Sequence, residues 1–262
     1  TQVGDFTGEV SLGDDSFLGE ASFSDGTYTI KACGSDIWGN SDGFYWVYKE
    51  ISGNWIITVD AAWDEEGAER YADVNVWRKM GIMARAEPES AESINVMGLL
   101  RSDLAANLQW RSEAGGGSDS IGQQGKAGTD TDTIRLVRTG SEFTLLRKTE
   151  SGTFRTIGSQ TVDTMPDEVY YGLAVTAHEA NNIESAKFSN LAVEPIDVVV
   201  SAVRTLPQDT FLPNSVINNI KIEGTVEEGK TADVTVKEML PAGWSLKSAN
   251  PSATSVDGSE IT

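Results

Sequence analysis

Short runs of β-branched and aromatic residues recur along almost the whole chain, and turn-forming residues separate them. Runs of this kind, bounded by Gly, Asp, Asn and Ser, are typical of β-strands. The best candidate for a helix, Asp64–Asp73, contains a glycine and has no apolar stripe, so we interpret it as a loop. The sequence therefore predicts an all-β chain. The clearest runs in its first 195 residues are Gly26–Ala32, Phe44–Ile51, Trp55–Ala62, Lys79–Ala86, Ser93–Leu100, Asn107–Ser112, Thr133–Thr139, Glu142–Thr149, Val169–Thr176 and Glu184–Val193.

The turns between these runs favour two packed sheets. Ser52–Asn54 and Thr139–Ser141 have the composition of tight hairpin loops, and Gly115–Gly128 is a longer loop rich in Gly, Ser and Gln. Many strands with evenly spaced turns pack as two sheets, because each sheet has an apolar face to bury. We therefore expect one large jelly-roll sandwich over residues 1–195.

Side-chain alternation places polar residues together on one sheet face. Successive residues of a strand point to opposite faces. Ile82 therefore lies opposite Arg85, and Leu108 lies opposite Gln109 and Arg111. The row of Arg85, Gln109 and Arg111 is consistent with a concave face that binds acidic glycans, since Arg pairs bidentately with carboxylates. An ion-paired face exposed to solvent is the alternative.

The last 67 residues predict a second and smaller module. Glu194–Asp197 reads as a linker, and four strand-like runs and the start of a fifth follow it. An Ig-like sandwich closes with about seven strands, so residues 196–262 predict a partial Ig-like β module. Further native sequence or a strand from another chain would complete it. The four runs are Val198–Thr205, Val216–Gly224, Ala232–Met239 and Trp244–Ser248.

The charge of the chain excludes some partners. Lys and Arg number 20 against 40 Asp and Glu, which gives a formal net charge of −20. Binding nucleic acid relies on basic side chains that displace counterions, so we expect no nucleic acid partner. No apolar stretch reaches 18 residues, so membrane insertion is not expected. Cys33 is the only cysteine, which rules out an intrachain disulfide, and we expect it to pack as a small apolar residue.

Five motifs follow one another along the chain: Gly26–Ile30, Ser35–Gly39 with Asp42–Phe44, Met80–Arg85, Leu108–Arg111 with Gly115–Gly117, and Tyr171–His178 with Phe188–Asn190. In this order they resemble the concanavalin A-like lectin/glucanase superfamily. More narrowly, they look like the laminin-G-like accessory domains of bacterial secreted glycosidases and surface proteins. The resemblance covers about residues 5–194, and it implies a jelly roll that is often stabilised by Ca²⁺ and often associated with polysaccharide. It also implies a secreted or cell-surface location. The tail is similar to bacterial Ig-like surface repeats at Val203–Pro207 and Leu240–Trp244.

Catalytic signatures are missing from the sequence. Glycanases that share the resembled fold carry Glu-x-Asp-x-x-Glu on one strand, and this spacing does not occur here. Asp64–Glu66 and Glu69 have the wrong spacing, and we interpret them as a solvated acidic loop. His178 is the only histidine and no Gly-x-Ser-x-Gly motif accompanies it, so neither a serine hydrolase nor a zinc site is expected. The sequence thus predicts a chain that is not an enzyme, with a glycan-cleaving enzyme as the minority alternative.

Two further sets of residues are candidates for ligand and metal binding. Asp36, Trp38 and Asp42 suit a carbohydrate platform, in which an indole stacks on a sugar and carboxylates accept its hydroxyls. A structural loop is the alternative for them, and His178 either joins the ligand site or caps a strand. The resemblance implies a structural Ca²⁺, for which the densest oxygen clusters in turns are Asp14, Asp15, Asp130 and Asp132. Neither pair completes an EF-hand loop.

Three functions remain open on these grounds. The first is an extracellular, non-catalytic module that binds a polysaccharide or a cell-surface glycan. The second is a structural subunit of a surface layer or filament that contacts other copies or neighbouring surface domains. The third is a glycan-cleaving enzyme.

Overall fold

The structure of the chain is a computed structural model. It describes residues 2–13, 19–64, 74–122 and 131–196, together with the backbone of five short strands beyond residue 199. The chain divides into two compact units, Thr1–Asp197 and Val198–Thr262. Every regular element in the described ranges is a β-strand, so the all-β class predicted from the sequence is confirmed. Among these residues, no helix has the length and apolar character needed to cross a membrane.

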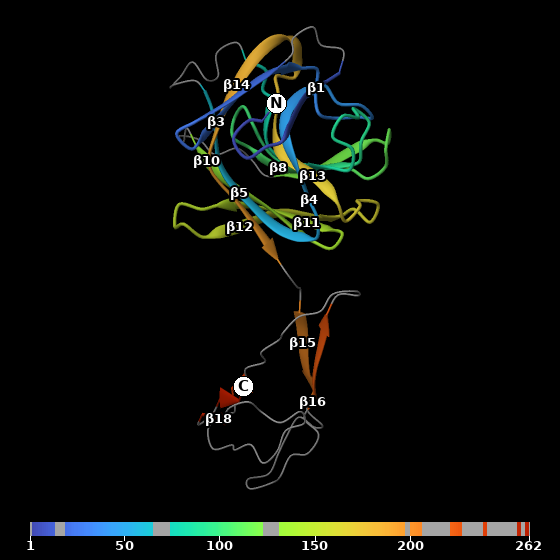
Figure 1. The fold of residues 1–262 in the computed structure, drawn as a ribbon, viewed down its shortest axis with the longest axis vertical. Coiled ribbons are helices and arrows are strands. Elements are labelled where there is room, and N and C mark those ends of the chain that lie inside the picture. The colour runs from blue at the N-terminus through green and yellow to red at the C-terminus, as the bar shows by residue number, and fades with distance from the viewer. Residues whose placement is uncertain are drawn as a thin grey trace. The chain divides into compact units, whose positions relative to one another are not determined.

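The first unit is a sandwich of two antiparallel sheets, which Figure 1 shows as two stacked layers. Each sheet has seven strands, and this arrangement is consistent with the expected jelly roll. The first sheet has the order β1 (Gly8–Leu12), β4 (Phe44–Ile51), β13 (Val169–Thr176), β6 (Lys79–Arg85), β7 (Asn95–Arg101), β8 (Ala106–Arg111) and β9 (Ser118–Gly122). The second has the order β12 (Phe154–Thr161), β11 (Glu142–Lys148), β10 (Asp132–Thr139), β5 (Asn54–Trp63), β14 (Glu179–Ile196), β3 (Thr27–Gly34) and β2 (Glu20–Ser24).

The main core lies between the two sheets. Val47, Ile82 and Leu173 from the first sheet face it, as do Ile57 and Leu136 from the second, and all are buried. Alternation along each strand sends every second residue to this layer. Fully burying such a side chain stabilises the folded state by about 1.5–3 kcal/mol. Cys33 is also buried, as expected of a small apolar residue.

The two predicted hairpin loops have different roles. Thr139–Ser141 does join a hairpin, since Thr139 of β10 pairs with Glu142 of β11. Ser52–Asn54 does not, because it connects β4 in the first sheet to β5 in the second. The hairpin prediction for Ser52–Asn54 is therefore wrong, and the segment is a crossover between layers. A glycine between polar residues marks a sharp turn, but it does not say which sheet the next strand enters.

Two connections fold over the outer face of the first sheet, which is the face turned away from the main core. Residues 35–43 join β3 to β4, and residues 86–94 join β6 to β7. A second apolar cluster forms beneath them and includes Ile37, Trp46 and Met97. The indole of Trp46 donates to the Pro88 carbonyl at 3.2 Å, which ties the second connection to the sheet. The outer face of this sheet is thus largely covered by the protein's own loops.

The described part of the second unit consists of short strands. β15 (Val200–Thr205) and β16 (Lys221–Val226) form an antiparallel pair. β17 (Glu238–Met239), β18 (Val256–Asp257) and β19 (Glu260–Ile261) form a three-stranded sheet. Most of residues 196–262 lie outside the described residues, so the Ig-like module there stays a prediction.

Candidate functional site

The connection of residues 35–43 is built around a close backbone approach. Gly34 has φ of +134°, and a Cβ on it would lie 2.2 Å from the Gly43 carbonyl oxygen. Only glycine fits this position. The Gly43 amide donates to the Asp36 carbonyl at 2.6 Å, and the Thr176 hydroxyl donates to the Gly43 carbonyl at 2.9 Å. The loop therefore closes on itself and presses Ile37, which is buried, onto the sheet.

A buried carboxylate holds this loop to the sheet. Asp42 receives both terminal nitrogens of Arg111, at 2.8 and 2.5 Å, and Nη1 of Arg85 at 2.8 Å. Asn95 donates to the same carboxylate at 3.3 Å. Both arginines are 0% exposed, and Asp42 is 2% exposed. Because each arginine carries a full charge away from water, the Asp42 carboxylate is the group that makes their burial tolerable.

The predicted polar row lies on one sheet face but is covered. Gln109 donates to the Ile37 carbonyl at 2.6 Å, Arg111 to the Gly39 carbonyl at 3.2 Å, and Arg85 to the Ser90 carbonyl at 2.5 Å. The structure thus corrects the accessible face that the sequence suggested for Arg85, Gln109 and Arg111. They are ion-paired or hydrogen-bonded beneath two loops, so they are exposed neither to a ligand nor to solvent.

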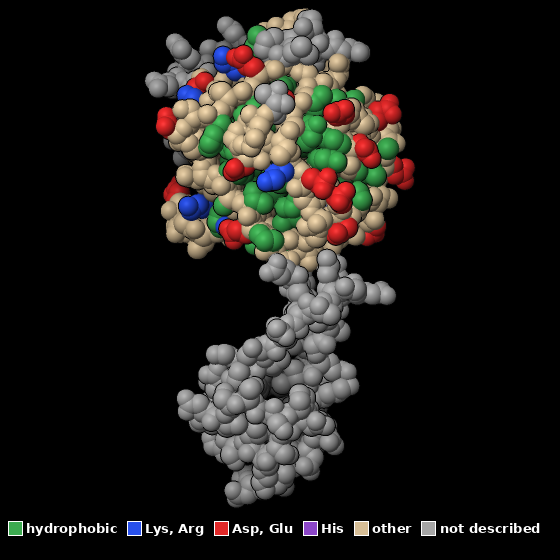
Figure 2. All heavy atoms as spheres, viewed as in Figure 1, with side chains coloured by type: hydrophobic (Ala, Val, Ile, Leu, Met, Phe, Trp, Pro, Cys, Tyr) green, Lys and Arg blue, Asp and Glu red, His purple; other side chains and the backbone are tan. Residues whose placement is uncertain are grey.

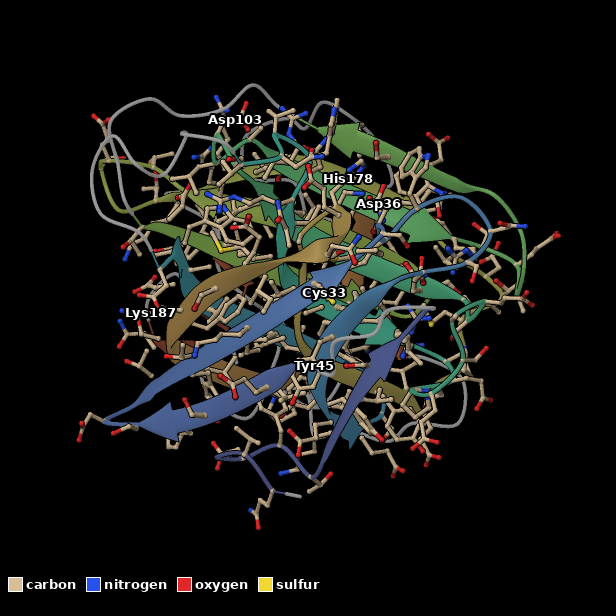
Figure 3. All side chains as sticks on the ribbon, turned by 90° about the horizontal axis from the view of Figure 1, so that it is seen from above. Cys33, Asp36, Tyr45, Asp103, His178 and Lys187 are labelled. Carbon is tan, nitrogen blue, oxygen red and sulfur yellow. The ribbon has the colours of Figure 1, made fainter. Side chains whose placement is uncertain are left out.

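Asp36 links three elements at the edge of the covered region. Its carboxylate lies 2.7 Å from Nζ of Lys79 and 3.2 Å from Nε2 of His178, and Figure 3 shows Asp36 and His178 side by side. Burial lowers the pKa of the Lys79 ammonium, and the charge of Asp36 opposes that shift. The side chains of Asp36 and His178 are 22% and 31% exposed, so both reach the surface. The backbone of His178 has a left-handed φ of +57°, and its carbonyl accepts the Asn75 amide at 3.5 Å.

Two indoles stand at the surface beside this group. Trp38 is 41% exposed, with Nζ of Lys79 5.4 Å from its ring centroid. Trp77 is 50% exposed, with the Arg101 guanidinium 4.6 Å from its ring centroid. Lys79 and Arg101 are direct partners across β6 and β7, so each indole covers one cation of the same cross-strand pair.

We call this surface the tryptophan rim. Its accessible members are Asp36, Trp38, Trp77, Asp103 and His178. Asp103 joins it through the Arg101 guanidinium, which lies 3.3 Å from the Asp103 carboxylate. The rim offers two flat apolar rings together with carboxylate oxygens and an imidazole. This set of groups can contact both the CH face and the hydroxyls of a sugar ring.

The seven ligand residues proposed from the sequence lie in one neighbourhood, but in two layers. Asp42, Arg85, Gln109 and Arg111 form the buried layer, whereas Asp36, Trp38 and His178 reach the rim. Trp77 was not foreseen. It lies just before the predicted strand Lys79–Ala86, and it contacts the Lys79–Arg101 pair only through the register of β6 with β7.

Three of the four proposed calcium ligands, Asp14, Asp15 and Asp130, lie outside the described residues. Asp132 is buried and forms a salt bridge with Arg147. In the ranges that the structure describes, no group of three or more His, Cys, Asp or Glu side chains is arranged to hold a metal ion.

Comparison with known proteins identifies a fold but no family. No family model matches the sequence, and no curated protein matches it. A functionally unknown protein from Saccharomyces cerevisiae has a similar structure, with a TM-score of 0.54 and 12% identity, over 68% of this chain and 92% of that one. The carbohydrate-binding module CBM66 from Bacillus subtilis matches with a TM-score of 0.47 and 14% identity, over 72% of this chain and 97% of the module. A seed lectin from Lotus tetragonolobus matches with a TM-score of 0.43 and 11% identity, over 72% of this chain and 98% of the lectin.

These likenesses concern the fold alone. The yeast protein shares the two-sheet β-sandwich at an identity too low to carry an activity across. The other two scores are lower still, so they carry no argument. The class established here is an all-β sandwich, and its function has to be argued from the tryptophan rim.

Proposed function

We propose that the chain is a non-catalytic carbohydrate-binding module that holds uncharged sugar rings at the tryptophan rim. The observation that carries the proposal is the pair of half-exposed indoles, Trp38 and Trp77, each positioned by a cation from one cross-strand pair. An exposed indole loses little conformational freedom on binding and offers a large flat surface. Sugar rings present CH faces that pack on such surfaces, and their hydroxyls find partners at Asp36 and His178.

The cations give the indoles a fixed orientation. Lys79 is held by Asp36 and by the Ile37 carbonyl at 2.8 Å, and Arg101 is held by Asp103. Each ring therefore rests on a group that is itself anchored. A platform positioned in this way binds with a smaller entropic penalty than a free side chain.

Two observations support binding rather than catalysis. Asp36 is shared between two basic partners, Lys79 and His178, which suits a carboxylate that accepts hydroxyls. The sequence also lacks the carboxylate spacing of the glycanases that share the resembled fold. An extracellular location and a structural Ca²⁺ belong to the same proposal, and the surplus of acidic residues supports both.

A glycan array tests the proposal, with binding measured in the presence and absence of Ca²⁺. The protein should retain one or more uncharged glycans, and Trp38→Ala and Trp77→Ala should each weaken that binding by about tenfold, or about 1.4 kcal/mol. Phe23→Ala is the matched control, because Phe23 is 44% exposed on β2 of the other sheet. The proposal would be overturned if Phe23→Ala weakened glycan binding as much as the two tryptophan variants do, or if the protein bound no uncharged glycan on the array.

A further inference from the structure

One region of the outer face of the first sheet carries partly exposed aromatic side chains, Tyr48 on β4 and Tyr170 on β13. Tyr48 stacks on buried Trp46 with ring centroids 4.9 Å apart and an interplanar angle of 30°. The ring of Tyr170 stands at 89° to that of Tyr48, with centroids 5.7 Å apart. We call this pair the tyrosine patch. Its two perpendicular rings form a corner on the sheet.

The neighbouring strand leaves room for this corner. Gly8 of β1 is the register partner of Tyr48, and a Cβ on Gly8 would lie 2.3 Å from the Tyr48 ring. Any larger residue would displace the ring, so the glycine allows it to lie over the sheet. The aromatic surface is therefore a consequence of the sequence of β1 as well as of β4.

Exposed glutamates surround the tyrosine patch. The Tyr48 hydroxyl donates to Glu89 at 3.3 Å, and Glu50 lies directly opposite Tyr170 in the β4–β13 pairing. Burial, and after it the charge of Glu89, raises the pKa of Tyr48. Burial likewise raises the pKa of Tyr170, with further contributions from the charges of Glu50, Glu168 and Glu87. Both hydroxyls therefore stay protonated at neutral pH and can donate hydrogen bonds to the neighbouring carboxylates.

The glutamates at the tyrosine patch have no salt-bridge partner in the part of the chain that the structure describes. Within the described ranges, no Lys or Arg forms a salt bridge with Glu50, Glu87, Glu89 or Glu168. Arg85, the register partner of Tyr170, pairs with Asp42 beneath the surface, and alternation directs Lys49 to the other face of β4. Figure 2 shows acidic side chains gathered around apolar ones on the right-hand part of the sandwich, where Figure 1 places β1, β4 and β13.

We propose that the tyrosine patch binds a glycan whose sugars carry protonated amino groups, as in deacetylated amino-sugar polymers. An aromatic ring with a carboxylate at hydrogen-bonding distance matches a sugar ring that presents a CH face and an ammonium group together. The carboxylates pair with the ammonium groups, and the rings pack on the sugar. A lysine-rich peptide would supply the charge but no ring to stack, so the tyrosines favour the amino sugar. This inference extends the proposed carbohydrate binding to a second surface and a charged ligand class.

The test is titration calorimetry of the full chain with the glucosamine hexamer and with the N-acetylglucosamine hexamer. We expect the glucosamine hexamer to bind at least tenfold more tightly, and the preference to weaken in high salt. The double variant Glu50→Gln/Glu89→Gln should weaken its binding by at least tenfold. These changes conserve side-chain shape at exposed positions, so we expect the double variant to fold normally. The control Glu142→Gln/Glu150→Gln changes the net charge equally at exposed positions beyond this face, in and after β11.

Three results would overturn the inference. Equal binding of the two hexamers would leave no role for the ammonium groups. Equal losses in the two double variants would indicate only bulk attraction to an acidic protein. Binding of polylysine as tightly as the glucosamine hexamer would point to a basic protein partner instead. Trp38→Ala should weaken binding of the uncharged glycan, whereas Glu50→Gln/Glu89→Gln should weaken binding of the glucosamine hexamer, so failure at the tryptophan rim and failure at the tyrosine patch are distinguishable.

Discussion

Asp42 is the residue on which the loops over the first sheet depend most. Its single carboxylate is the shared counter-ion of two arginines that are completely buried, and its backbone amide donates to the Ala91 carbonyl of the second loop at 2.9 Å. Removing one partner of a buried charge cluster leaves the others without compensation. Asp42 is therefore a structural residue that supports the tryptophan rim from below.

Replacing Asp42 should destabilise the sandwich severely. We expect Asp42→Asn to lower the free energy of unfolding by about 3–5 kcal/mol, since two buried guanidinium groups lose their counter-charge. Urea denaturation of the full chain measures this change, and Asp103→Asn at the exposed edge should change it by less than about 1 kcal/mol. Similar values for the two variants would show that the buried cluster is not what secures the loops.

Tyr171 makes the stability sensitive to alkaline pH. Burial raises its pKa to about 12 from 10.0, with a further contribution from the charge of Asp5. The phenol ionises near pH 10 in the unfolded chain but only near pH 12 in the folded chain. Its contribution to the free energy of unfolding is therefore fully present below pH 10 and is lost as the pH rises toward 12. Between pH 9 and pH 12, the free energy of unfolding should fall by about 2 kcal/mol less in Tyr171→Phe than in the unsubstituted chain. Urea denaturation at the two pH values checks this, and an unchanged loss in the variant would contradict it.

The candidate site was only partly predictable, for a reason that particular residues make clear. Alternation within a strand is a local property, so it correctly placed Arg85, Gln109 and Arg111 on one face. The burial of the two arginines depends on Asp42, which is 69 residues from Arg111 in the sequence. Trp77 gains its neighbours only through the register of β6 with β7. No local pattern encodes contacts of this range.

At the level of elements, the strands missed by the sequence reading share one position. β1, β9, β12 and β2 are the four edge strands of the two sheets. An edge strand has one unpaired side and a largely exposed surface, so it needs few apolar residues and shows weak alternation. β9 is an example, since four of its five residues are exposed. The central strands were recognisable because both their faces are buried, as in β6.

The difference between edge and central strands also predicts how their backbone amides exchange with solvent. Amides of central β13 should exchange with solvent only through global unfolding, whereas those of β9 and β12 should exchange through local fraying. Native-state hydrogen exchange followed by mass spectrometry measures both in one experiment. Equal protection of β9 and β13 would contradict the prediction and would indicate that the edges are covered in solution.

At the scale of the whole molecule, the full chain carries a net charge of −20, and its first unit is a well-packed sandwich. Self-repulsion among acidic side chains opposes the compact state, and salt relieves it by screening. Any cation therefore stabilises the chain to some degree. A calcium site has to be distinguished from this general effect by its specificity.

We predict that Ca²⁺ raises the melting temperature beyond what screening explains. At a free concentration about 100-fold above its Kd, a bound ion adds about 2.7 kcal/mol. For a sandwich of this size that corresponds to a rise of roughly 5–10 °C. Calorimetry of the full chain in 150 mM NaCl, with 1 mM CaCl₂ or with chelator, measures the rise, and 1 mM MgCl₂ controls for divalent screening.

The ligand variants locate the effect. Asp14→Asn and Asp130→Asn probe the two clusters that the sequence singled out. Asp103→Asn is the matched control, because Asp103 is partly exposed and pairs only with Arg101 among the described salt bridges. Loss of the Ca²⁺-dependent rise in one ligand variant, with the rise kept in the control, would assign the ion to that cluster. A melting temperature that responds equally to Ca²⁺ and Mg²⁺, or that is unchanged by chelator, would show that the acidic surplus serves solubility and that the sandwich holds itself together without a specific ion.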